Sequence, residues 1–177
     1  MTHTIFRDWQ VKAYMDGRLT RFCVPVRLLS KQWSIPPARM VGNSFTRDGN
    51  LQESIPSPFI PGERVWVKTR WQMGTGPGKK VYPASRMPRA YSPLTLTITA
   101  CRVVQFAEIT DDDAEVCGIS GEAHQWATES STDAPYKSTA KLAYMYNWDS
   151  HHKPPYQVDD NPFLWCVDIE RYPNGNT

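Results

Sequence analysis

The stretch PFIPGERVWVKTRW, from Pro58 to Trp71, decides the fold class. Its Pro61-Gly62 pair predicts a turn, because proline presets φ and glycine accepts a positive φ. After the turn, apolar positions alternate with positions that carry an aromatic ring or a cation. This period of two indicates a half-buried β-strand. The two faces of the strand are formed by Val65, Val67 and Thr69 and by Trp66, Lys68 and Arg70.

The second face of this strand is open to two interpretations. An aromatic ring beside two cations is common in modules that hold a nucleotide or a phosphate chain. An ordinary solvated sheet face has the same alternation. Other parts of the chain must decide between them.

The same periodicities predict the other elements of the chain. Strands are expected at 4–6, 21–28, 94–106 and 163–170, and a hairpin from 40–45 and 51–54 around the Asp48-Gly49 turn. Pro25 favours an edge position for the second strand, because proline has no amide hydrogen to donate. Helices are expected at 8–16 with Asp8 as N-cap, at 110–118 with Thr110 as cap, and from Ser138 or Thr139 to Trp148. Strands outweigh helices, which predicts an α+β or mainly β fold, a small β-barrel with helices packed over its ends.

The size and composition of the chain indicate an ordinary globular protein. It has 177 residues, of which 40% are hydrophobic and 21% charged. Apolar runs fall short of the ~20 residues that span a membrane, and the N-terminus lacks the pattern of a signal peptide, so we expect a cytoplasmic protein. The four cysteines show no CxxC spacing and are expected to be free thiols. Their spacing, and that of the histidines and acids, indicates no metal site and no cofactor.

Charge is distributed unevenly along the sequence. Residues 1–102 hold 16 of the 20 Lys and Arg and 5 of the 18 Asp and Glu, whereas residues 103–177 hold the rest. This asymmetry favours a polyanion-binding surface in the first part of the chain. The alternative is that the two parts neutralise each other across the fold.

Five segments in order resemble the ASCH domain, a member of the PUA-like superfamily. They are FRDWQVKAYMDGRLTR (6–21), PFIPGERVWVKTRW (58–71), ASRMPRAYSPLTLTITACRVVQFAEITDDDAEVCGI (84–119), WDS (148–150) and NPFLWCVDIER (161–171). The last two are similar to the ending of phage and prophage versions. The resemblance implies a single PUA-like domain over 1–172 with an insertion at about 30–57. The glycine-rich stretch 74–80 predicts a flexible loop, and 173–177 is expected to be a tail. The resemblance also implies a cleft suited to RNA or a modified nucleoside.

Some members of this family are amidohydrolases of acetylated cytidine, and this sequence departs from their pattern. The family's lysine position is Leu19 here, and its threonine position is Phe22. Only Asp111 stands where the hydrolases place their acid. A lysine-activated threonine nucleophile cannot be assembled from these side chains. We therefore expect no such catalysis, with Lys68 and Asp111 as the only remaining candidates for catalytic groups.

The sequence thus favours a non-catalytic module that binds nucleic acid, with RNA preferred over DNA, or a nucleotide. Guanidinium groups bind phosphate bidentately, and stacking on an aromatic ring contributes roughly 1–3 kcal/mol per base. The candidate contact residues are Arg18, Thr20, Arg21, Lys68, Arg70, Trp71, Arg86 and Arg89, with Trp66 as a second stacking candidate. Two alternatives stay open. One is a nucleoside- or RNA-processing hydrolase, and the other is a phage accessory protein that binds a host protein through its acidic C-terminal part.

Overall fold

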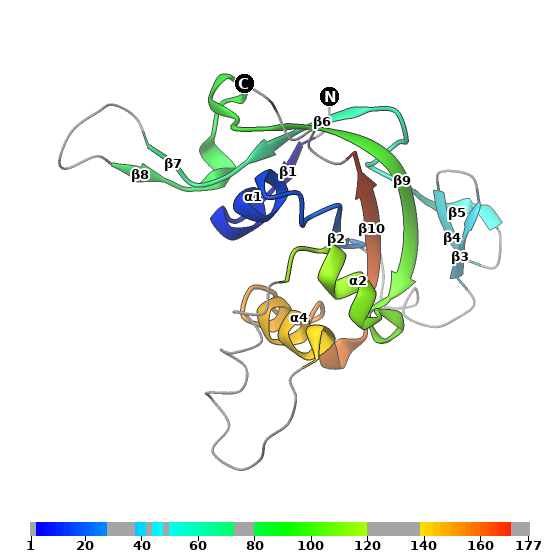
Figure 1. The fold of residues 1–177 in the computed structure, drawn as a ribbon. Coiled ribbons are helices and arrows are strands. Elements are labelled where there is room, and N and C mark those ends of the chain that lie inside the picture. Colours follow the sequence, from blue (N-terminus) through cyan, green and yellow to red (C-terminus); the bar gives the residue numbers. More distant parts are fainter. Residues whose placement is uncertain are drawn as a thin grey trace, which may run out of the picture.

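The structure is a computed structural model, which describes residues 3–27, 38–41, 44–47, 50–72, 80–119 and 139–170. Figure 1 shows a curved sheet with helices packed beside it. The strands are β1 (His3–Ile5), β2 (Arg21–Pro25), β3 (Ala38–Val41), β4 (Ser44–Arg47), β5 (Asn50–Pro56), β6 (Arg64–Lys68), β7 (Trp71–Gln72), β8 (Val81–Tyr82), β9 (Thr95–Gln105) and β10 (Phe163–Ile169). The α-helices are α1 (Asp8–Met15), α2 (Asp111–Val116) and α4 (Ala140–Asp149), and short 3-10 turns include η2 (Ala84–Arg86), η3 (Arg89–Tyr91), η4 (Phe106–Glu108) and η5 (Val158–Asp160).

The main sheet has five strands in the order β1-β6-β9-β10-β2. β1 pairs with β6 in parallel, and the other neighbours are antiparallel. The long strand β9 changes partner along its length. Thr95 to Thr97 pair with β6, and Ile98 to Gln105 pair with β10. β9 therefore joins two parts of the sheet that run in different directions, and Figure 1 shows it as a curved band.

The central stretch of the sequence forms the predicted strand. Val65 and Val67 are fully buried, while Trp66 and Lys68 on the other face are half-buried. Gly62, with φ of 85°, forms the turn before the strand and donates its amide to the carbonyl of Ile98. The predicted alternation is thus confirmed, although the strand is divided into β6 and the two-residue β7.

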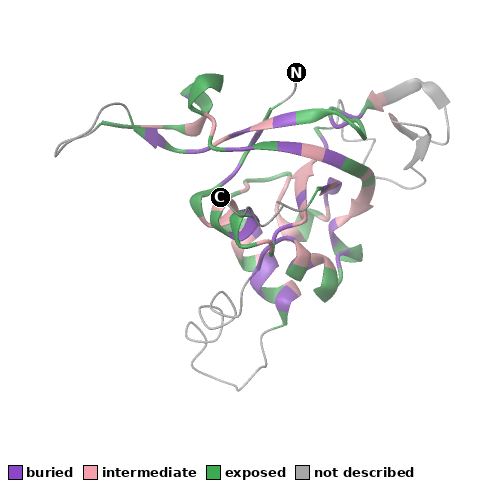
Figure 2. Cartoon of the chain, turned by 45° about the horizontal axis from the view of Figure 1, so that its top comes forward, coloured by how far each residue is buried: buried purple, intermediate pink, exposed green. Residues whose placement is uncertain are grey.

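β10 separates two hydrophobic cores. Phe163, Trp165, Val167 and Ile169 point into the core beneath α1, and the intervening Leu164 and Cys166 point into the core beneath α2 and α4. A strand covered on both faces reads as a continuous apolar run rather than an alternation. Figure 2 shows the resulting buried residues along the sheet and on the sides of the helices that face it.

The predicted helices are confirmed with small shifts in their ends. Thr110 caps α2 by accepting the amide of Asp113, and Thr139 caps α4 by accepting the amide of Leu142. The predicted N-cap at Asp8 is wrong by one residue. Arg7 is the N-cap, and its amide donates to Oε1 of Gln10. Asp8 is therefore the first helical residue, where an acid also stabilises the helix dipole.

The predicted hairpin exists as a separate three-stranded sheet. Its order is β3-β4-β5, and β4 and β5 flank the expected turn. The predicted strand at 40–45 is divided between β3 and β4. The Asp48-Gly49 turn itself lies outside the described residues, as do the polar stretch 120–137, the tail 173–177 and all of the predicted loop 74–80 except Lys80.

The sheet of the predicted small β-barrel is not closed in the part of the chain that the structure describes. The main sheet is open, with β1 and β2 as its edges. β1 has only three residues, and β2 ends at Pro25, which has no amide hydrogen for a further ladder. The fold is α+β, with a five-stranded mixed sheet and three α-helices among these residues. None of these helices is long and apolar enough to cross a membrane.

Two glycines with the same backbone conformation provide a test of this packing. Gly62 and Gly118 both have φ of 85°, a region that costs an alanine about 1–2 kcal/mol. A Cβ at Gly62 would meet nothing within 4 Å, whereas one at Gly118 would lie 2.8 Å from Cβ of Ala13 and 3.2 Å from Cβ of Leu19. We expect Gly118→Ala to lower the free energy of unfolding by about 3–4 kcal/mol, since overpacking adds to the backbone cost. Urea denaturation gives this value.

Gly62→Ala is the matched control for the backbone cost and should lower the free energy of unfolding by about 1–2 kcal/mol. Equal effects of the two substitutions would show that α1 and the end of α2 do not pack as closely as described.

Candidate nucleic-acid interface

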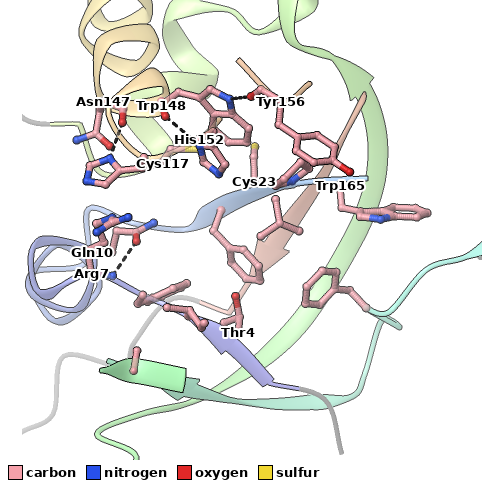
Figure 3. A pocket seen from close by; sticks show the side chains of 18 of the residues that line it. Thr4, Arg7, Gln10, Cys23, Cys117, Asn147, Trp148, His152, Tyr156 and Trp165 are labelled. Atoms are coloured by element: carbon pink, nitrogen blue, oxygen red, sulfur yellow. Dashed lines mark hydrogen bonds between the residues drawn. The ribbon is translucent and has the colours of Figure 1, made fainter. Parts of the chain in front are cut away.

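A cleft of about 790 Å³ lies where the main sheet meets α1 and the end of α4. Its walls come from β1 and the start of α1, from β2, from the segment before β6, and from the last turn of α4 with the residues that follow (Figure 3). This volume lies within the range of sites that hold drug-sized molecules. Three arginines and one acid are among the described residues that line it, namely Arg7, Arg27, Arg70 and Asp8.

The start of α1 and the residues after β6 bring two of these arginines together. Partial burial lowers the pKa of Arg7, and the positive charge of Arg70 lowers it further. Asp8 opposes this repulsion only in part. Its Oδ1 accepts the hydroxyl of Thr69 at 2.8 Å, and its Oδ2 lies 3.8 Å from Nη2 of Arg70. The Arg70 side chain is 71% exposed and can still contact an anion.

The end of α4 supplies aromatic rings and two histidines. The His152 ring stacks on Trp148 with 3.8 Å between centroids, and its Nδ1 lies 2.9 Å from the carbonyl oxygen of Trp148. Because a carbonyl only accepts, Nδ1 carries the proton and Nε2 is left as an acceptor. Burial lowers the pKa of His152, so the ring is neutral at pH 7. His151 bonds in the same way to the carbonyl of Asn147, and both histidines thereby cap the helix.

The indole N–H groups of two tryptophans beside the cleft are held inside the fold. Nε1 of Trp148 donates to the carbonyl of Tyr156 at 2.6 Å. Nε1 of Trp9 is buried and has no acceptor among the described residues. A buried donor without an acceptor costs about 1–3 kcal/mol, so Trp9 is held in this place by its packing against the core beneath α2 and α4.

Of the residues predicted as contacts, only Arg70 lines the cleft. Arg21 instead forms two ion pairs inside the fold. Its Nε lies 2.5 Å from Oδ1 of Asp168, and its Nη1 contacts Oδ1 of Asp113. Burial lowers the pKa of Arg21, but the two carboxylates outweigh it and the net shift is upward.

Arg18 and Thr20 also have structural partners. Arg18 contacts Oδ2 of Asp16 at 3.0 Å and donates to the carbonyl of Gly118 at 3.2 Å. The Thr20 amide donates to Val116, and its carbonyl accepts the amide of Ile169. These contacts join the end of α1 to α2 and β10, so the two residues support the fold whatever else they bind.

The other predicted contact residues lie on β6, β7, η2 and η3, and they do not line the cleft. Trp71 is buried and packs against Tyr82 and Tyr91, with 4.9 and 5.0 Å between centroids. Its role as a stacking platform stays a prediction, and a base would have to compete with the tyrosines. Arg86 and Arg89 are exposed on η2 and η3. Lys68 lies over the Trp66 ring at 5.0 Å, and its Nζ donates to the carbonyl of Ser85 at 3.4 Å.

The two candidate catalytic groups are not brought together in the cleft. Neither Lys68 nor Asp111 is among the described residues that line it. Oδ1 of Asp111 accepts the amide of Lys141 at 2.8 Å, which joins α2 to the start of α4. Leu19 and Phe22 lie in the hydrophobic core. The described residues contain no group of three or more His, Cys, Asp or Glu that could hold a metal ion.

Sequence reasoning missed most of the cleft. Arg7, Trp9, Trp148, His152 and Tyr156 line it but were not predicted as contacts. The signals were an arginine and a tryptophan at the start of a helix and a His-His pair directly after one. Both patterns are also typical of ordinary helix ends. They indicate a binding site only once the fold shows that the two helix ends lie together.

Comparison with known proteins does not assign the chain to a family. No protein-family model matches the sequence. No curated protein matches it either. The fold has a likeness to the crystal structure of protein EF3133 from Enterococcus faecalis V583, described as DUF984, with a TM-score of 0.39 and 9% identity over 96% of this chain and 80% of that one. A likeness at this score decides neither family nor function.

The ion pairs of Arg21 predict a pH-dependent stability. Burial raises the pKa of Asp113, but hydrogen bonds from Thr110 and the charges of Arg102 and Arg21 lower it below its usual value of 3.8. The charged form thus stabilises the fold fully above the unfolded pKa, and this contribution is lost as the pH falls through the lower folded pKa. We expect Asp113→Asn to lower the free energy of unfolding at pH 7 by about 2 kcal/mol. Urea denaturation from pH 7 to pH 3 should show the difference from wild type shrinking below about pH 4.

The control is Asp112→Asn, which removes an exposed carboxylate from the same helical turn. At pH 7 it should lower the free energy of unfolding by less than half as much as Asp113→Asn does. A difference between wild type and Asp113→Asn that stayed constant down to pH 3 would contradict the ion-pair explanation.

Proposed function

We propose that this chain is a PUA-like module of the ASCH type that binds single-stranded RNA without catalysis, with one nucleotide held in the cleft. The ASCH assignment rests on the five sequence segments, and the ligand on the chemistry of the cleft. The observation that carries the proposal is the set of three arginines, with one acid, around a cleft that also contains aromatic rings.

The arginine pair provides the phosphate site. Arg7 and Arg70 repel each other, and a phosphate between them would relieve that repulsion. Guanidinium groups bind phosphate oxygens with charge-assisted, frequently bidentate hydrogen bonds. Arg70 is mostly exposed, so its side chain can turn toward a ligand without breaking a strong ion pair.

The end of α4 gives the cleft a surface that suits a base. Neutral His152 offers a nitrogen acceptor, and the arginines that line the cleft offer N–H donors, so the cleft has both hydrogen-bonding characters. The edges of RNA bases present donors and acceptors together, and single-stranded bases are free to enter such a pocket. The rings of Trp148 and Tyr156 add apolar surface.

The surface beside the cleft is suited to bind further nucleotides of an RNA chain. Residues 64–107 contain eight Lys and Arg and no Asp or Glu. Within this stretch Lys80 is exposed just before β8, Arg86 and Arg89 are exposed on η2 and η3, and Ala84 of η2 lines the cleft. A basic strip that begins at the cleft supports RNA over a free nucleotide, because a chain would continue across it.

The protein-binding alternative rests on a different face. Leu142 and Tyr146, one turn apart on α4, are 41% and 66% exposed, and α4 packs on the acidic helix α2. This surface suits a protein partner with apolar and basic side chains. The open cleft and the exposed Arg70 favour the RNA proposal instead.

Salt-dependent binding tests the RNA proposal. Arg7→Ala and Arg70→Ala should each weaken the binding of a labelled 12-nucleotide single-stranded RNA. Each should also reduce the slope of log K against log salt by about 0.7, the value for one phosphate of a single strand. The double substitution Arg86→Ala/Arg89→Ala should weaken binding of the 12-mer but leave binding of a mononucleotide unchanged. Fluorescence anisotropy across a salt series measures all of these.

Lys12→Ala is the matched control, because Lys12 is an exposed cation on α1 that does not line the cleft. It should leave the slope unchanged. Equal effects of Lys12→Ala and Arg70→Ala would indicate non-specific attraction. No binding at low salt would rule out the proposal and direct attention to the face of α4.

A further inference from the structure

We propose that Cys23 and Cys166 are a site of oxidative modification, at which hydrogen peroxide converts the two thiols into a disulfide between β2 and β10. This inference does not depend on the proposed function. It rests on the register of the two strands, on the contact between the sulfurs and on access from the cleft.

The two cysteines lie directly opposite each other in the sheet. The amide of Val26 donates to Phe163, and the amide of Ile169 donates to Thr20, which identifies the hydrogen-bonded pairs of this antiparallel ladder. Cys23 and Cys166 fall between these pairs, so they form a non-hydrogen-bonded pair with about 4.5 Å between Cα atoms. Disulfides span Cα distances of roughly 4.4–6.8 Å, so a bond can form without moving a strand.

The side chains already point at each other. Their Sγ atoms lie 2.8 Å apart. Both thiols belong to the core beneath α2 and α4, where Cys166 is fully buried and Cys23 is partly exposed. Cys23 lines the cleft, as does the buried Cys117, whereas Cys166 does not (Figure 3). Cys23 is therefore the thiol that meets the oxidant, and Cys166 is the one that completes the bond.

The chemistry balances with one peroxide. The sulfur of Cys23 attacks one peroxide oxygen, the O–O bond breaks, and the products are a sulfenic acid and one water. The sulfur of Cys166 then attacks the sulfur of Cys23, the S–O bond breaks, and a second water leaves with the thiol proton. Two thiols lose two electrons, and one hydrogen peroxide is reduced to two waters.

The surroundings make the first step slow at neutral pH. A hydrogen bond with the Cys117 thiol, and burial, raise the pKa of Cys23. A hydrogen bond with Cys23, and burial, raise the pKa of Cys166. The thiolate is the reactive form, so oxidation should accelerate as the pH rises. Cys117 also lies beside Cys23 and is the competing partner, whereas Cys101 contacts Ser57 at 3.4 Å.

Peptide mapping decides which bond forms. The reduced full-length chain is treated with hydrogen peroxide, unfolded in the presence of an alkylating agent and digested without reduction. We expect a Cys23–Cys166 linkage, alkylation of Cys101 and Cys117, and full reversal by dithiothreitol. The melting temperature should rise on the order of 10 °C, because the bond closes a loop of more than a hundred residues.

Two variants separate the steps. Cys117→Ser should keep the linkage, and the double variant Cys117→Ser/Cys166→Ala, which has no neighbouring thiol, should leave a sulfenic acid on Cys23 that reacts with dimedone. The wild-type map remains decisive if either variant fails to fold. Four alkylated cysteines after peroxide treatment, or a Cys23–Cys117 linkage in wild type, would overturn the proposal.

Discussion

Burial of β10 on both faces is the constraint on which the rest of the structure depends. The strand lies between β9 and β2 and contributes alternate residues to two cores. Its one partly exposed residue, Asp168, accepts Arg21 from the opposite position of β2. An open sheet of five strands needs cover on both sides, and α1 supplies it on one side and α2 with α4 on the other. The cleft forms where these two covers meet.

This arrangement explains why the cleft combines residues that are far apart in the sequence. The start of α1 presents Arg7 and Trp9, and the end of α4 presents Trp148 and His152, about 140 residues later. Helix ends carry unpaired backbone groups and polar caps. Two such ends beside each other give a pocket whose walls can both donate and accept hydrogen bonds. The cleft is thus a consequence of how α1 and α4 are packed against the sheet.

Most of the helices and strands could be predicted because they depend on neighbouring residues. Most of the site could not, because it depends on contacts between residues far apart in the sequence. Thr110 and Thr139 are recognised as caps from a few neighbouring residues, and the alternation before Trp71 identifies β6. Closure of the sheet depends on whether β1 and β2 meet, which no local pattern determines. Arg21 and Arg70 look alike in the sequence, each beside a strand. Only the register of β2 with β10 shows that Arg21 is used internally.

The two explanations of the charge asymmetry therefore apply to different arginines. Arg21 and Arg102 from the basic part contact Asp113 from the acidic part, so internal neutralisation accounts for some of the imbalance. Asp113 is only 12% exposed, and its carboxylate faces these two arginines rather than solvent. The basic strip around Arg86 and Arg89 has no acid within its own 44 residues, from 64 to 107. A folded chain that leaves such a strip exposed beside an arginine-lined cleft retains an excess of positive charge where a polyanion can reach it.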